Sequence, residues 1–198
     1  MRYRRANIPN ATYFFTVNLA ERKLSLLTEN IDVLRAVMRK VKQNHPFTIE
    51  AIVVLSDHLH AIWTLPEGDA DFAMRWSLIK AGFSRAIAKT ERINKSRAAK
   101  RERGIWQRRY WEHQIRDDAD LQSHVDYIHY NPVKHGYVKQ ACDWRFSSIH
   151  AYIRAGKVDA NWGGIVENSE GFGEKLAVGL RCALRQPTKI RTIHNAQK

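Results

Sequence analysis

The sequence predicts an α+β fold of the ferredoxin-like, split βαβ type. We expect a four-stranded antiparallel sheet with helices on one face, followed by one further helix. Segments with strand-like and helix-like apolar spacing alternate along the chain in the order βαββαβα, and a βαββαβ chain closes into such a sheet. The 198 residues suit one domain with a tail. We place the domain at 1–155 and a basic, loosely structured C-terminal extension at 156–198.

The first half of the chain supplies three strands and one helix. Residues 12–20, TYFFTVNLA, are aromatic and β-branched, which is typical of a strand. From Ile31 to Asn44, apolar residues recur three and four positions apart, so this segment is an amphipathic helix. Residues 47–55 and 58–66 are apolar runs separated by Ser-Asp. That is the spacing of a hairpin, although Ser-Asp is not a favoured turn dipeptide.

The second half begins with a helix and a strongly basic stretch. Asp69 or Asp71 can cap a helix that runs to about residue 89. Residues 89–110 hold nine basic and two acidic residues, which indicates a mobile or ligand-ordered loop. Residues 110–116 alternate weakly and are the fourth strand.

The charge of the chain favours a polyanionic partner. Lys and Arg number 33 against 20 Asp and Glu, which leaves a net charge of +13. Each phosphate that such a surface neutralises releases condensed counterions, so nucleic acid is the expected partner. No stretch approaches the roughly 20 apolar residues of a membrane span, and the N-terminus lacks the apolar region of a signal peptide. We therefore expect no membrane association and a cytoplasmic protein, held at the nucleoid through DNA.

Two histidines lie one residue apart in the second strand of the hairpin. Because side chains alternate along a strand, His58 and His60 point to the same face. Two imidazoles on one face are half of a metal site, which needs at least a third ligand. A purely structural pair remains an alternative, since most His-x-His motifs bind nothing.

A late helix carries candidate partners for these histidines. Residues 117–136 open on capping aspartates and end at Asn-Pro and Gly136, so we expect a helix with an irregular end. Tyr127 and Asn131 are four residues apart and share one face. Asn can ligate a hard cation through its carbonyl oxygen, and a phenol beside a metal-polarised phosphate can attack phosphorus. The plainer interpretation is a tyrosine packed on the sheet.

Other side chains of this helix are less suited to the same centre. Tyr130 is a rival nucleophile, but it neighbours Asn131 and points about 100° away from it. We interpret His124, His129 and His135 as surface or DNA-facing groups.

The motifs DHLHAIW and, some seventy residues later, DYIHYNPVKHG together resemble the single-tyrosine HUH transposases, specifically their REP-associated tyrosine transposase branch. The segments YRRANIPNATYFFTVNL, IWQRRYWEHQIRDDAD and NPVKHGYVKQACDWRFSS are also similar, so the resemblance covers roughly residues 1–155.

The resemblance implies a site and a reaction. His58 and His60 would be metal ligands and Asn131 the third, where the wider family often has Gln. The cation would be Mg²⁺ or Mn²⁺. Tyr127 would attack the scissile phosphate of single-stranded DNA carrying a REP-type hairpin, leaving a 5′-phosphotyrosine and a free 3′-hydroxyl. The resemblance slightly favours a monomer over a homodimer.

Basic and aromatic residues are the candidate DNA contacts. Arg and Lys would bind phosphates, while Trp106, Tyr110 or Trp111 could stack on unpaired bases. A solvated loop is the alternative for the basic stretch. The candidates are Arg4, Arg5, Arg97, Lys100, Arg101, Arg103, Trp106, Arg108, Arg109 and Lys134.

Two other functions fit the residues. A split βαβ sheet with a basic surface and outward-facing aromatics also suits a noncatalytic, RRM-like module that binds single-stranded nucleic acid. A metal-dependent nuclease that uses activated water would leave Tyr127 a structural role.

Overall fold

The first strand of the sheet, β1 (Thr12–Asn18), lies between two neighbours. In the computed structural model, which describes residues 8–89, 93, 95–99 and 102–164, the sheet order is β2-β3-β1-β4 and every pairing is antiparallel. The other strands are β2 (Thr48–Val54), β3 (His58–Thr64) and β4 (Trp111–Gln114). This confirms the predicted split βαβ sheet.

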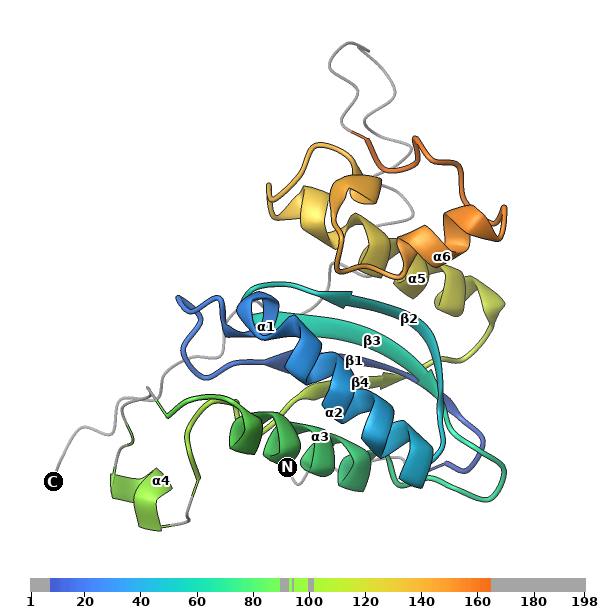
Figure 1. Cartoon of the computed structure of the whole chain (residues 1–198). Coiled ribbons are helices and arrows are strands. Elements are labelled where there is room, and N and C mark those ends of the chain that lie inside the picture. Colours follow the sequence, from blue (N-terminus) through green and yellow to red (C-terminus); the bar gives the residue numbers. More distant parts are fainter. Residues whose placement is uncertain (1–7, 90–92, 94, 100–101, 165–198) are drawn as a thin grey trace, which may run out of the picture.

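Helices cover both faces of the sheet (Figure 1). Helices α2 (Ile31–Asn44) and α3 (Phe72–Ala86) lie on one face, as predicted, while α5 (Asp118–Lys134) lies on the other. The shorter helices are α1 (Leu26–Glu29), α4 (Lys95–Ala99), η1 (Ala141–Asp143) and α6 (Ile149–Arg154). Among the described helices, none is both long and apolar enough to cross a bilayer.

Each face of the sheet has its own apolar core. Trp63 of β3 stacks on Trp76 of α3, with ring centroids 4.1 Å apart, in the core beneath α2 and α3. On the opposite face, Phe14 of β1 and Ile62 of β3 pack against Ile128 of α5. Helix α5 is therefore held against the face to which His58 and His60 point.

The helix boundaries refine the sequence predictions. The amphipathic helix spans Ile31–Asn44 as expected. Asp71, not Asp69, caps α3, because its side chain accepts a hydrogen bond from the Met74 amide at 2.8 Å. Helix α5 does not stop at the Asn-Pro pair. Pro132 lies in its last turn, where the missing amide removes only one hydrogen bond.

The described parts of two segments contain more structure than predicted. The basic stretch 89–110, expected to be a loop, contains the short helix α4. Residues 156–164, assigned to the extension, pack onto the domain: Trp162 lies in the cluster of Val133 and Ile149. The rest of the extension, 165–198, lies outside the described residues.

Candidate active site at the start of strand β3

His58 and His60 lie side by side on the face of the sheet that α5 covers. Their ring centroids are 5.0 Å apart, and both side chains are buried. They pair across the sheet with Asn18 and Thr16 of β1. The predicted common orientation of the two imidazoles is therefore realised at the beginning of β3.

The Nδ1 atom of each imidazole is occupied by a neighbouring side chain. His58 Nδ1 lies 2.6 Å from the Asp57 carboxylate, whose other oxygen accepts a 2.6 Å hydrogen bond from Arg22. His60 Nδ1 lies 2.9 Å from Thr16 Oγ1. These contacts fix both rings and leave their Nε2 atoms for another partner. His60 Nε2 is buried and has no hydrogen-bond partner among the described residues.

The electrostatics of the site favour a neutral His60 imidazole and an ionised Asp57 carboxylate. Burial, together with the nearby His58 and His135, holds the pKa of His60 well below its usual range. Burial opposes ionisation of Asp57, but hydrogen bonds from His58 and Arg22 outweigh it and hold its pKa well below the usual range. A neutral imidazole is the form that ligates a metal.

Helix α5 brings the predicted tyrosine to the same place. The Tyr127 ring lies 5.1 Å from the His60 ring, and Phe14 of β1 touches both. Burial raises the pKa of Tyr127. The ammonium group of Lys134 lies 5.0 Å from the centre of the Tyr127 ring. Partial burial lowers the pKa of Lys134. Tyr130 instead packs toward Val133 and Trp162, away from this site.

The donors gathered here fit a divalent cation. Asn131 is 1% exposed, and neither its amide oxygen nor its amide nitrogen has a hydrogen-bond partner among the described residues. Such orphaned polar atoms are costly in a protein interior unless a ligand satisfies them. Two imidazole nitrogens and an amide oxygen are a donor set that suits Mn²⁺ or Mg²⁺.

Two of the three other histidines, His124 and His129, differ from the prediction, whereas His135 agrees with it. His124 and His129 are buried, not surface groups, because α5 is packed against the sheet on one side and against the segment that follows it on another. His129 bonds Ser148 Oγ at 2.9 Å. His135 is exposed, and its ring lies 5.4 Å from that of His58.

The DNA-contact candidates separate into distinct groups. Lys134 lies at the site and Arg109 is exposed. Arg103 is used internally, since it donates hydrogen bonds to the Ser84, Ile87 and Ala88 carbonyls at the end of α3. Arg97 donates to the Trp106 carbonyl, and exposed Arg108 pairs with Glu102. Four candidates lie outside the described residues: Arg4, Arg5, Lys100 and Arg101.

Trp106 is not available for base stacking, in contrast to the prediction. It is 8% exposed, packs against Phe83 with ring centroids 5.4 Å apart, and donates its indole N–H to the Lys80 carbonyl. Its neighbourhood is nevertheless basic. A cavity of about 740 Å³ beside α3 is lined by Lys80, Arg85, Arg97, Arg103 and Arg108. This cavity lies on the α3 side of the sheet, opposite Tyr127.

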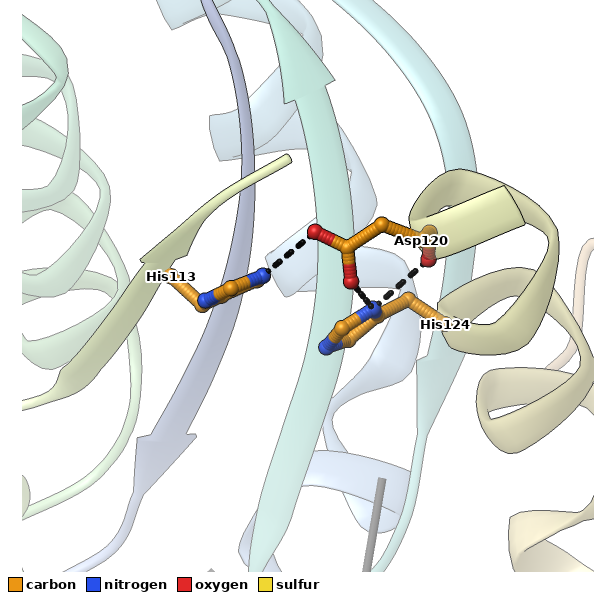
Figure 2. Close-up of side chains that lie close together, drawn as sticks. All are labelled: His113, Asp120 and His124. Carbon is orange, nitrogen blue, oxygen red and sulfur yellow. Dashed lines mark hydrogen bonds and ion pairs between the residues drawn. The ribbon is translucent and has the colours of Figure 1, made fainter. Parts of the chain in front are cut away.

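A second polar cluster joins β4 to the start of α5 (Figure 2). Asp120 accepts hydrogen bonds from His113 Nε2 at 2.8 Å and from the Arg116 backbone and guanidinium, and His124 Nδ1 lies 3.1 Å from its other oxygen. The ligand atoms of His113, Asp120 and His124 are close enough to hold a metal ion. In this structure, however, they satisfy one another and Arg116.

Sequence reasoning missed several of the residues that shape the site. Asp57 carried a signal, since it belongs to a Ser-Asp pair that is not a favoured hairpin turn and directly precedes a candidate ligand. Thr16 and His113 carried none, because their partners lie on other strands or helices and depend on the register.

Comparisons with known proteins support the resemblance. Residues 8–131 match the family described as "Transposase IS200 like". The chain is 46% identical over 174 residues to the REP-associated tyrosine transposase of Escherichia coli (strain K12), covering 88% of this chain and 97% of the relative. It is also similar to a solved structure of a REP-associated tyrosine transposase bound to a REP hairpin. That match has 46% identity and a TM-score of 0.72, and covers 86% of this chain and 95% of the other.

Proposed function

The chain belongs to the IS200-like transposase family, in its REP-associated tyrosine transposase branch, and from that membership we propose that it cleaves and rejoins single-stranded DNA at REP-type hairpins. Tyr127 is the nucleophile, and a divalent cation held by His58, His60 and Asn131 assists it. The products of cleavage are a 5′-phosphotyrosine and a free 3′-hydroxyl.

One observation carries this proposal. A tyrosine lies 5.1 Å, ring to ring, from a buried histidine whose Nε2 has no partner among the described residues, and an equally orphaned Asn131 amide lies one helical turn from that tyrosine. Structural packing alone would leave these polar atoms unsatisfied at a considerable free-energy cost. A cation would satisfy His60 Nε2 and the Asn131 amide oxygen, and a phosphate oxygen bound to that cation could accept a hydrogen bond from the Asn131 amide nitrogen.

The side chains of this chain perform most of the chemistry. The Tyr127 oxygen attacks phosphorus in line, a bond from this oxygen to phosphorus forms, and the bond from phosphorus to the 3′-oxygen breaks. The departing oxygen keeps the electron pair and takes up a proton, while the phenol loses one. Burial raises the pKa of Tyr127 and so disfavours the phenolate that attacks phosphorus. A cation near the ring counteracts this effect, and the Lys134 ammonium group lies there.

The bound metal would supply charge stabilisation at the non-bridging phosphate oxygens. Asp57 and Thr16 hold the two imidazoles through Nδ1, so that their Nε2 atoms would be the ones to ligate the metal. Rejoining is the reverse reaction: a 3′-hydroxyl attacks the phosphotyrosine and releases Tyr127. The covalent link conserves the phosphodiester energy, so the cycle needs no ATP.

The partner and the assembly follow from the same arrangement. The similar solved protein binds a REP hairpin, and the charge of +13 suits a nucleic-acid partner here as well. The His60 and Tyr127 rings lie 5.1 Å apart within one chain, as a tyrosine acting in cis requires, and we propose a monomer, which the family resemblance slightly favours. We place the catalytic domain at residues 1–155 and the protein in the cytoplasm, at the nucleoid.

The experiment is a denaturing gel of labelled, single-stranded REP-hairpin DNA incubated with protein and Mn²⁺. We expect an SDS-resistant adduct with the wild type and none with Tyr127→Phe, His58→Ala or His60→Ala. Cleavage without an adduct that persists in Tyr127→Phe would instead identify the water-using nuclease. DNA binding without cleavage under any metal would identify the RRM-like module.

A further inference from the structure

Trp111 stands at the edge of the sheet on the same face as the proposed site. In the antiparallel register, Thr16 of β1 pairs with His60 on one side and with Trp111 on the other. Trp111 and His60 therefore belong to one cross-strand row, two strand spacings or about 10 Å apart. An unpaired base of the nucleotide next to a phosphate at His60 can reach across that distance.

The Trp111 indole is exposed, whereas the other described tryptophans are buried or partly buried. Trp111 is 38% exposed and lies on β4, an edge strand. Helix α5 packs mainly over β2 and β3, on the far side of β1. Aromatic side chains exposed on the face of a sheet are surfaces on which single-stranded nucleic acids can stack their bases.

The ring is also held in place before any ligand arrives. Phe14, which touches Tyr127 and His60, packs its ring against Trp111 with centroids 5.6 Å apart. The plane of His113 is within 7° of the indole plane at 5.9 Å. His113 in turn stacks on His124 at 4.8 Å and is hydrogen-bonded to Asp120 (Figure 2). A fixed ring loses little entropy on binding.

We propose that Trp111 is a stacking platform for the unpaired base that flanks the scissile phosphate. The inference rests on the proposed function, because the position of the phosphate comes from the His58–His60–Tyr127 site. It assigns the cluster of His113, Asp120 and His124 the task of positioning the platform. A metal ion there is disfavoured, because both Asp120 oxygens already accept hydrogen bonds or face His124 Nδ1.

The test uses 2-aminopurine, whose fluorescence is quenched when it stacks on an aromatic ring. It is placed at each position flanking the cleavage site of a REP-type hairpin with single-stranded flanks. All proteins carry Tyr127→Phe, so that the DNA stays intact. The variants are Trp111→Ala, Trp111→Phe and, as a control, Leu78→Ala, which removes a side chain of similar exposure, 37%, on α3. Thermal unfolding of each variant checks that it is folded.

The parent is the protein that carries Tyr127→Phe alone. We expect quenching at one flanking position in the parent, in Trp111→Phe and in Leu78→Ala. Trp111→Ala should lose the quenching and bind the flanked hairpin about 5- to 150-fold more weakly, the range for one base–aromatic stack. All four proteins should bind a hairpin trimmed of its flanks equally. Unchanged quenching and affinity in Trp111→Ala, or an equal loss on the trimmed hairpin, would overturn the platform.

The two proposals can fail separately. If the wild type forms no covalent adduct but the parent still quenches through Trp111, the phosphotyrosine mechanism is wrong and the platform stands. If the adduct forms and Trp111→Ala behaves like the parent, only the platform is wrong.

Discussion

The Asp57 carboxylate lies 2.6 Å from Nδ1 of His58, the residue that follows it in the chain. The carboxylate is ionised, and Arg22 holds its other oxygen. A His ring that donates its Nδ1 proton to a carboxylate presents a more basic Nε2 in a fixed direction. The Ser-Asp pair that makes an unusual hairpin turn is thus explained by what Asp57 does for His58.

Removing this contact should weaken metal binding. Asp57→Asn keeps a carbonyl that can still accept from the imidazole, so we expect about a 10-fold loss of Mn²⁺ affinity, and Asp57→Ala should approach 100-fold. Isothermal titration with Mn²⁺ measures both, and Asp32→Asn on the exposed side of α2 is the control. Wild-type affinity in Asp57→Ala would show that Asp57 does not orient a ligand.

Thr16 should orient the His60 ring as Asp57 orients the His58 ring. Thr16→Val keeps the shape and the β-branching but leaves His60 Nδ1 without its 2.9 Å partner, so the ring loses its fixed orientation. We expect about a 10-fold loss of Mn²⁺ affinity and a matching loss in the rate of adduct formation at limiting metal. Thr16→Ser retains the hydroxyl and should restore both. Equal Mn²⁺ affinities and equal adduct rates for Thr16→Val and Thr16→Ser would show that the Thr16 hydroxyl does not orient His60.

The sequence predicted those parts of the site that depend on local geometry. Strand alternation placed His58 and His60 together, and the helical repeat placed Tyr127 above Asn131. It failed where burial depends on long-range packing. His129 was assigned to the surface because a helix usually buries one face, whereas α5 is buried on two. Trp106 and Arg103 were assigned to DNA because nothing local indicates that their segment folds back onto α3.

Trp106 should matter for stability and not for base recognition. Trp106→Ala removes a side chain packed on Phe83 and should lower the free energy of unfolding by about 3–5 kcal/mol, while Trp106→Phe should lose less. Urea unfolding measures the change. The affinity for flanked hairpin DNA, measured well below the unfolding temperature, should stay within about twofold of the wild type, because a buried indole offers no face to a base. A large loss of affinity at unchanged stability would restore Trp106 as a DNA contact.

His129 should make the protein less stable in acid. The side chain is 0% exposed, and burial, reinforced by His150, lowers its pKa to about 4. In the unfolded chain the same imidazole titrates near 6.5. Between these values the unfolded state binds a proton that the folded state cannot, so stability falls as the pH drops through 6.5 and levels off near 4.

The expected loss from this one residue is about 2 kcal/mol between pH 8 and pH 5. Urea unfolding at the two pH values should therefore give a smaller drop for His129→Gln than for the wild type. Glutamine does not titrate and can still reach Ser148, the hydroxyl that His129 bonds at 2.9 Å. The other titratable groups are common to both proteins and cancel in the difference. Identical pH dependence in the two proteins would mean that His129 takes up its proton at the same pH in the folded chain as in the unfolded chain, in spite of its burial.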